Sequence, residues 1–350
     1  MRLPGRATIG DVARSADVSV STVSKVLNGR YGVAVLTAAR VQEVIAQLGY
    51  EPSLVARSLR SNQTNVIGVL VAEFEPFSTE LLKGVSKAIG GSGYELLAYS
   101  GGGRAGGNAG WERRYLSRLS GTLIDGAILV TPTVVDGDYR IPVVAVDPHT
   151  GPSDLPTVDS DNLSGAVLAT KHLIGLGHRR IGFLGGRSDL DSARLREEGY
   201  RTALTEAGIP LDPDLIRIGG YREESAERPA LELLTMPERP TAIFAANDLS
   251  AIRTMDVARS LGLKVPDDLS VIGFDNIPES ALTTPPLTTI NQPIQQMGFV
   301  AMRLLIDLID GTEVPDPHRQ LPTTLVPRGS CRAVRPVDQG LDGDGARRAT

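Results

Sequence analysis

The chain has 350 residues, 41% hydrophobic and 22% charged, a balance typical of a globular protein and not of a disordered or fibrous one. At about 150 residues per domain, this length predicts two or three domains. No stretch approaches the roughly 18–20 consecutive apolar residues of a membrane span, and the N-terminal MRLPGRATIGD lacks the apolar segment of a secretory signal. A single cysteine, Cys331, excludes an internal disulfide and a multi-cysteine zinc site. We therefore expect a cytoplasmic protein with no membrane contact, metal or cofactor.

The net charge of −5 is unevenly distributed along the chain. Residues 1–62 carry eight Lys or Arg and four Asp or Glu, a net +4, so the rest of the chain carries −9. A basic head on an acidic body predicts a polyanionic partner for the head alone.

Residues 1–51 show no strand pattern and are typical of three short helices. The helices are expected from Thr8 to about Ala16, from Ser19 to Asn28, and from about Thr37 to Leu48. Thr8 followed by Asp11 matches the capping box that begins a helix, and Gly49 matches the residue that ends one.

The second helix has an inner apolar face and an outer polar face. Its outer face carries Ser21, Ser24 and Lys25, while Val23 and Val26 face inward. A helix with short polar side chains can enter the ~12 Å major groove of DNA, with lysine near the phosphates. A plain three-helix packing module is the alternative.

Residues 52–61 form a separate segment. Pro52 can start a helix, and Ala56 and Leu59 fall three residues apart on one face. A helix of about seven residues is unstable alone, so it needs a partner. The alternative is a simple linker.

The remainder alternates apolar runs with amphipathic stretches of helical length. The expected strands are 66–72, 94–100, 126–131, 141–147, 180–185, 241–248 and 269–275. Continuous apolar strands separated by helices indicate parallel sheets covered on both faces. A pause near 148–158 favours two doubly wound lobes over a single sheet. We expect an N-lobe of about 62–160 plus 291–320, a C-lobe of about 161–290 plus 321–330, and a disordered tail at 331–350.

Polar residues follow three of these strands, at Asp147, Asn247 and Asp275. Because the carboxyl ends of parallel strands meet at one edge of a sheet, these side chains can converge on a ligand. Carboxylates and amides at such positions suit hydrogen bonding to hydroxyl groups. Alternatively, each could cap the helix that follows.

Motifs along most of the chain resemble the LacI/GalR family of transcriptional repressors. They are DVARSADVSVSTVSKVLNG, LGYEPSLVARSL, LGHRRIGFLGG, SARLREEGY, AIFAANDLSA, VIGFDN and PPLTTINQP, in order from about residue 8 to 330. The resemblance implies an N-terminal all-α helix-turn-helix head with a hinge helix, plus an α/β two-lobed periplasmic-binding-protein-like (type I) effector domain. It also implies a homodimer that binds palindromic double-stranded operator DNA.

The resemblance also implies roles for individual residues. The DNA-binding set is Thr8, Ser19, Val20, Ser21, Thr22, Lys25, Asn28, Ala56 and Leu59. Val20, Ser21 and Lys25 would read base edges, and Leu59 would wedge into the minor groove. The effector-binding set is Phe77, Ser78, Asp147, Arg196, Tyr221, Asn247 and Asp275.

The expected effector is a small sugar, because few aromatic residues (4%) disfavour a stacked purine. A two-lobed sugar-transport protein or an enzyme of similar fold is the alternative. The basic head disfavours the first, and the missing G-x-S-x-G motif leaves hydrolysis without support. Residues 331–350 contain no apolar heptad, so we expect a dimer and no tetramer.

Overall fold

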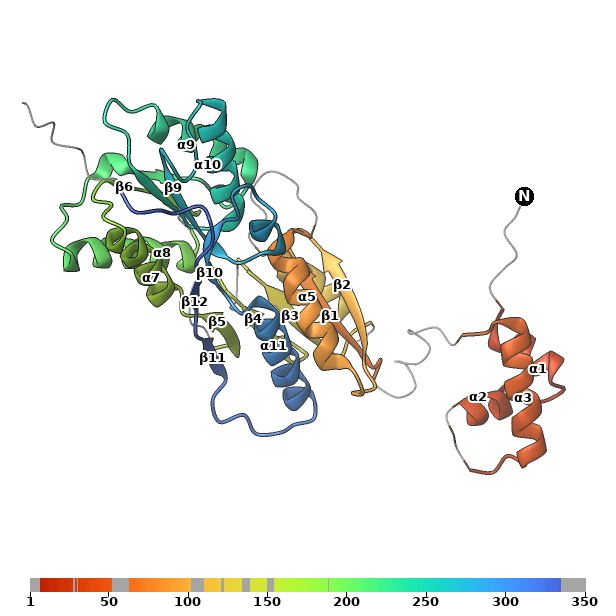
Figure 1. The fold of residues 1–350 in the computed structure, drawn as a ribbon. Helices are drawn as coiled ribbons and strands as arrows, with labels where there is room; N and C mark the ends of the chain where they lie inside the picture. The colour runs from red at the N-terminus through yellow and green to blue at the C-terminus, as the bar shows by residue number, and fades with distance from the viewer. Residues whose placement is uncertain are drawn as a thin grey trace, which may run out of the picture. The chain divides into compact units, whose positions relative to one another are not determined.

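The computed structural model describes residues 7–27, 29, 31–51, 63–101, 110–120, 123–133, 139–149, 154–187 and 189–334 (Figure 1). The chain divides into two compact units, Met1–Asn65 with Leu119–Asp125, and Val66–Arg118 with Gly126–Thr350. The expected hinge at 52–61, with Ala56 and Leu59, lies outside the described residues, as does Asn28.

The described part of the N-terminal head contains three helices. They are α1 (Ile9–Ser15), α2 (Val20–Leu27) and α3 (Val35–Leu48). The capping box is confirmed, since the Thr8 hydroxyl accepts from the Asp11 amide while the Asp11 carboxylate accepts from the Thr8 amide. Gly49, at φ 56°, ends α3 in the left-handed conformation that glycine adopts without strain. Helix α3 begins two residues before the expected start.

The head has its own hydrophobic core. Val12, Val23 and Val41 are fully buried, and smaller contributions come from Ala13 and Val44. The core draws on all three helices, so the head is stabilised by its own contacts.

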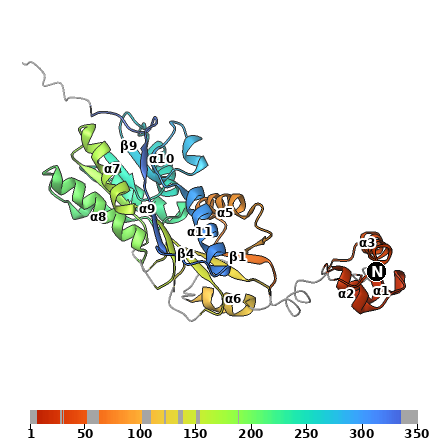
Figure 2. The same cartoon turned by 90° about the horizontal axis from the view of Figure 1, so that it is seen from below.

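The N-lobe is built around a six-stranded sheet in the order β11-β5-β4-β3-β1-β2, with every neighbouring pair parallel. Its strands are β1 (Val66–Val71), β2 (Glu95–Ser100), β3 (Gly126–Val130), β4 (Val143–Val146), β5 (Thr157–Ser160) and β11 (His318–Leu321). Its helices are α5 (Pro76–Ile89), α6 (Trp111–Leu119) and α11 (Ile294–Ile309). Helices α5 and α11 lie side by side (Figures 1 and 2).

The C-lobe repeats this plan with the order β12-β10-β9-β8-β6-β7, and only the edge pair β10–β12 is antiparallel. Its strands are β6 (Ile181–Gly185), β7 (Ile216–Ile218), β8 (Ala242–Ala245), β9 (Ser270–Asp275), β10 (Thr288–Asn291) and β12 (Thr324–Val326). Its α-helices are α7 (Asn162–Gly175), α8 (Asp191–Glu206), α9 (Glu223–Leu234) and α10 (Asp248–Ser260), and its 3₁₀ turns are Pro213–Leu215 and Pro278–Ala281. Helices α7 and α8 cover one face of the sheet, and α9 and α10 cover the other (Figure 1).

All seven strands predicted from the sequence are present, and the described residues form five others that were missed. The missed strands have only three or four residues. Three of them, β7, β11 and β12, lie at sheet edges and contain no fully buried residue, so they lack a continuous apolar pattern. Central strands β1, β3 and β4 are buried along their whole length, which explains their continuous apolar pattern.

The chain passes between the two sheets three times, between β5 and α7, between β10 and α11, and between β11 and β12. These crossings place both lobes around a shared cleft.

Two glycines allow α5 and α11 to approach closely. A Cβ on Gly84 would lie 1.8 Å from the Gln295 carbonyl oxygen, and one on Gly298 would lie 2.2 Å from that of Leu81. Only glycine fits at these helix crossings.

The expectation of disorder from residue 331 is wrong for its first four residues. The Arg332 amide donates to Ser270 Oγ at 3.1 Å, and the Val334 amide donates to the Leu176 carbonyl at 2.9 Å. These hydrogen bonds from backbone amides hold residues 331–334 against the C-lobe, although the segment has no apolar pattern. Residues 335–350 lie outside the described range.

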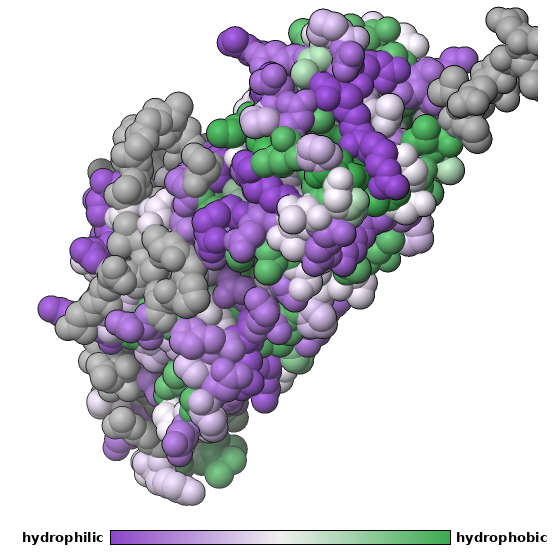
Figure 3. Space-filling model, turned by 90° about the vertical axis from the view of Figure 1, so that its left-hand side faces the viewer, coloured by the Kyte–Doolittle hydropathy of each residue, from purple (hydrophilic) through white to green (hydrophobic). Residues whose placement is uncertain are grey.

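The face of the molecule in Figure 3 is mainly hydrophilic, with smaller hydrophobic areas between. Within the described residues, no helix has the length and apolar character needed to cross a membrane.

Candidate functional site

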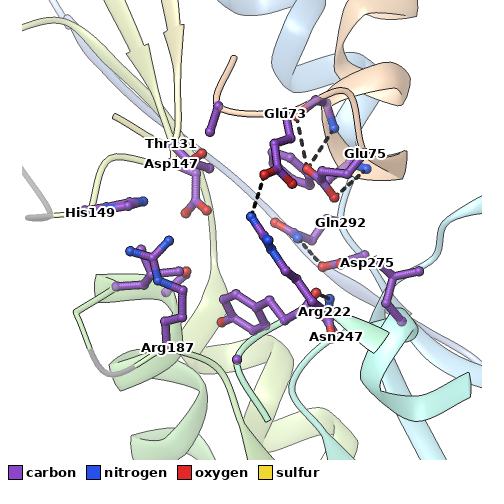
Figure 4. A pocket seen from close by; sticks show the side chains of 18 of the residues that line it. Glu73, Glu75, Thr131, Asp147, His149, Arg187, Arg222, Asn247, Asp275 and Gln292 are labelled. Carbon is purple, nitrogen blue, oxygen red and sulfur yellow. Dashed lines mark hydrogen bonds and ion pairs between the residues drawn. The ribbon is translucent and has the colours of Figure 1, made fainter. Parts of the chain in front are cut away.

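A cavity of about 160 Å³ lies between the two lobes (Figure 4). All seven residues expected to contact an effector line it, namely Phe77, Ser78, Asp147, Arg196, Tyr221, Asn247 and Asp275. Several of them follow strand carboxyl ends, where parallel sheets commonly bind ligands. The structure therefore brings the whole predicted set together.

Arg196, on α8, is buried and fixed by several partners. Its Nε donates to Asn162 Oδ1 at 2.9 Å, and its Nη1 donates to the Ala246 carbonyl and lies 3.4 Å from Asp275 Oδ1. The Phe274 ring lies against the guanidinium, 3.8 Å from Cζ to the ring centroid. The arginine is thus held in one position before any ligand arrives.

Asp275 ends β9 at φ 112°, a backbone conformation uncommon for a residue with a side chain. Gln292 Nε2 donates to its Oδ1 at 2.6 Å. Burial raises the pKa of Asp275 to about 7, and the nearby Arg196 charge opposes that rise. This carboxyl can therefore accept a hydrogen bond when ionised and donate one when protonated.

Asp147 follows β4 at φ 49°, and burial raises the pKa of its carboxyl. Its neighbour Asp159, on β5, has a pKa raised to about 7, first by burial and then by the Asp147 charge. Nearby His149, which also lines the cavity, has a pKa lowered to about 4, mainly by burial. The N-lobe side of the cavity is therefore rich in partly buried carboxyl groups.

Asn247 both caps a helix and lines the cavity. Its Oδ1 accepts from the Ser250 amide at the start of α10, and its Nδ2 donates to the Tyr221 carbonyl. The capping alternative is therefore confirmed for Asn247, and it is compatible with a place in the cleft.

Two aromatic rings provide apolar surface. Phe77 lies in the first turn of α5, and Tyr221 lies 5.4 Å from the Arg196 guanidinium, measured from ring centroid to Cζ. A Cβ at Gly186 would come within 2.2 Å of the Tyr221 ring, so this glycine makes room for it. Ser78 Oγ donates to Glu75 Oε1 at 3.0 Å.

Sequence reasoning missed several residues that line the cavity. They are Glu73, Glu75, Thr131, His149, Arg187, Ser192, Arg222 and Gln292. Glu75 caps α5 by accepting from the amides of Phe77 and Ser78, and burial raises the pKa of its carboxyl. An acid directly before Pro-Phe, four residues after the end of β1, could have signalled this role. Gln292 belonged to the quoted PPLTTINQP motif but was not singled out.

The head presents a separate polar surface on α2. Val20, Ser21 and Lys25 are exposed, whereas Val23 on the inner face is fully buried. Ser19 caps the helix by accepting from the Thr22 amide at 3.1 Å. Thr8 and Thr22 thus take part in helix caps, and Val20, Ser21 and Lys25 remain available on the surface.

Comparison with known proteins identifies both parts of the chain. Residues 8–53 match a family described as bacterial regulatory proteins, lacI family, and residues 170–331 match a periplasmic binding protein-like domain. The HTH-type transcriptional repressor PurR of Aliivibrio salmonicida is 38% identical over 314 residues, 87% of this chain and 92% of that protein. The ribose operon repressor of Escherichia coli is 38% identical over 335 residues, 93% of this chain and 99% of that protein.

Solved structures agree with this relationship. The lac repressor dimer bound to operator and the anti-inducer ONPF is 28% identical, with a TM-score of 0.79, covering 94% of this chain and all of that chain. The transcriptional regulator CelR in complex with cellobiose is 32% identical, with a TM-score of 0.69, covering 93% of this chain and all of that chain. With a matching head, a matching body and relatives aligned along nearly the whole length, this chain belongs to the LacI family of DNA-binding transcriptional repressors.

Proposed function

We propose that this protein is a homodimeric repressor whose affinity for operator DNA is changed by a small neutral sugar bound between its lobes. The observation that carries the proposal is the convergence of Arg196, Asn247 and Asp275 in one buried cavity. The exposed face of α2 supplies the DNA-binding surface, with Ser21 placed to contact the bases and Lys25 placed near the phosphates. Like other members of its family, the protein acts on DNA in the cytoplasm.

A sugar suits the cavity because its lining combines hydrogen-bonding groups with apolar rings. Carboxylates and amides accept from hydroxyl groups, and the buried guanidinium donates to their oxygens. Phe77 and Tyr221 offer flat surfaces for the C–H face of a sugar ring. The relatives that align along nearly the whole chain are transcriptional repressors, so we propose that the protein has no enzymatic activity.

Operator binding is proposed to require a dimer, since two heads reading one palindrome have the two-fold symmetry of their site. The related lac repressor structure contains a dimer on operator. We expect a dimer, and light scattering on the purified full chain measures this directly.

Two assays test the proposal. A gel shift compares a fragment from the promoter region of the protein's own gene with random DNA of equal length. A thermal-shift screen with D-ribose, D-glucose, cellobiose and hypoxanthine then identifies the effector class. We expect specific binding of the promoter fragment, and a change in that binding with a sugar. A response to hypoxanthine alone would refute the sugar assignment.

A further inference from the structure

An ion pair crosses the cleft between the two lobes. Arg222 Nη2 lies 2.7 Å from Glu73 Oε1, and both residues line the cavity (Figure 4). Glu73 follows β1 in the N-lobe, and Arg222 precedes α9 in the C-lobe. The contact therefore exists only while the two lobes lie close together.

The pair lies at the mouth of the cleft and not at its base. The side chains of Glu73 and Arg222 are 35% and 64% exposed, whereas those of Asp275 and Arg196 are 9% and 3% exposed. Arg222 makes no side-chain capping bond to α9, so this side chain is not needed to start the helix.

A second contact between the lobes provides an independent sensor of closure. The Asp191 amide, at the start of α8, donates to the His149 carbonyl of the N-lobe at 2.9 Å. The His149 ring also lies 3.8 Å from Asp189, measured from Nδ1 to Oδ2. If the lobes separate, the Asp191 amide loses its partner and becomes accessible to water.

We propose that Glu73 and Arg222 form a clasp that holds the cleft closed and thereby determines the size of the ligand. With the clasp formed, the cavity of about 160 Å³ is below the roughly 300–1,000 Å³ of sites for larger ligands. A single sugar ring fits inside, whereas a second ring requires the clasp to open. The identity of the ligand in this inference rests on the proposed sugar-binding function, whereas the closure of the cleft by the ion pair does not.

The strength of the pair suits a clasp that must open and close. Exposed ion pairs shift an equilibrium by only about 1.4- to 5-fold. A ligand can therefore enter without a large barrier, and loss of the pair should shift the ratio of closed to open molecules by no more than this factor. Because the pair is exposed, raising the salt concentration should weaken the clasp.

Hydrogen exchange on the full-length protein without ligand tests the clasp. The variants are Glu73→Gln, Arg222→Gln and the reversed pair E73R/R222E. The matched control is Arg228→Gln, because Arg228 pairs with Glu232 at 3.0 Å within α9 and does not cross the cleft. We expect exchange at the Asp191 amide to rise about two- to five-fold in both single variants. The reversed pair should restore slow exchange, and the control should match wild type. Unchanged exchange in both single variants overturns the proposal.

Titrations with D-ribose, D-glucose and cellobiose then test the ligand size. In the single variants, we expect affinity for the monosaccharide to fall and affinity for cellobiose to rise relative to it. Equal ratios in wild type and variants refute the size selection. Faster exchange with no sugar bound by any variant supports the clasp and refutes the sugar assignment. Sugar binding with unchanged exchange supports the sugar assignment and refutes the clasp.

Discussion

The side-chain amide of Gln292 donates a 2.6 Å hydrogen bond to Oδ1 of Asp275, and its own carbonyl oxygen accepts from Ser160 Oγ at 2.5 Å. Gln292 lies in the crossing from β10 to α11, and Ser160 ends β5 just before another crossing. A ligand that alters the hydrogen bonding of Asp275 therefore acts directly on the segments that join the two lobes.

Replacing Gln292 by methionine should weaken both effector binding and folding. The substitution keeps the volume but removes the partners of two buried polar groups, at about 1–3 kcal/mol for each group left unsatisfied. Urea unfolding measures the loss of stability, and calorimetric titration with the effector measures the loss of affinity. Gln296→Met, at an exposed position in the first turn of helix α11, is the control and should change neither quantity. Wild-type values for Gln292→Met would contradict the argument.

Arg196→Lys should abolish the effector response while operator binding is kept. Lysine has a single nitrogen, which cannot occupy the positions of both Nε, which bonds to Asn162, and Nη1, which bonds to the Ala246 carbonyl and lies near Asp275. We therefore expect effector affinity to fall at least about ten-fold. The head has a separate core, and a gel shift without effector should match wild type. Arg201→Lys, exposed on the same helix and paired with Glu197, is the control. Undiminished effector affinity would remove Arg196 from the binding site.

The sequence predicted the pocket residues better than it predicted the contacts between lobes. Asp147, Asn247 and Asp275 could be found because strand ends converge in any parallel sheet, whatever the orientation of the two lobes. The Glu73–Arg222 pair joins residues 149 positions apart, and its existence depends on how far the cleft is closed. No local pattern carries that information. The order of residues 331–334 was missed for a similar reason, since it comes from backbone bonds to a distant strand.

The pH dependence of stability should reveal the partly buried carboxyl of Asp159. Its pKa is raised to about 7 in the folded protein, against an ordinary value of 3.8, so the folded state binds more protons than the unfolded state between these values. The free energy of unfolding therefore falls as the pH rises from about 4 to 7. Asparagine does not ionise, so Asp159→Asn does not lose stability in this way. We expect the free energy of unfolding of the variant, minus that of wild type, to increase by about 1–3 kcal/mol from pH 5 to pH 8. Urea unfolding at both pH values tests this, and an equal difference at both would refute it.

Gly84→Ala should destabilise the N-lobe through one methyl group. The new Cβ would lie 1.8 Å from the Gln295 carbonyl, so α5 and α11 must separate or shift. Overpacking of this kind typically costs about 1–3 kcal/mol. Thermal unfolding measures the effect, and the control is Gly175→Ala on helix α7, where the added methyl group would meet only open space. Equal melting temperatures for the two variants would contradict the close helix contact.

Lys25→Ala should weaken binding to operator and to random DNA by a similar factor, because we expect this exposed lysine to neutralise a phosphate. The loss of one phosphate contact reduces the steepness of the plot of log binding constant against log salt concentration by about 1. The loss of a base contact instead lowers affinity for the operator selectively. The side chain is exposed on α2, so folding and effector affinity should stay unchanged. Gel shifts on both DNAs at several salt concentrations separate the two roles. Gln47→Ala, an uncharged change at an exposed position of α3, is the control and should leave the slope as it is. An unchanged slope in Lys25→Ala, with binding lost on operator alone, would assign Lys25 to a base edge instead.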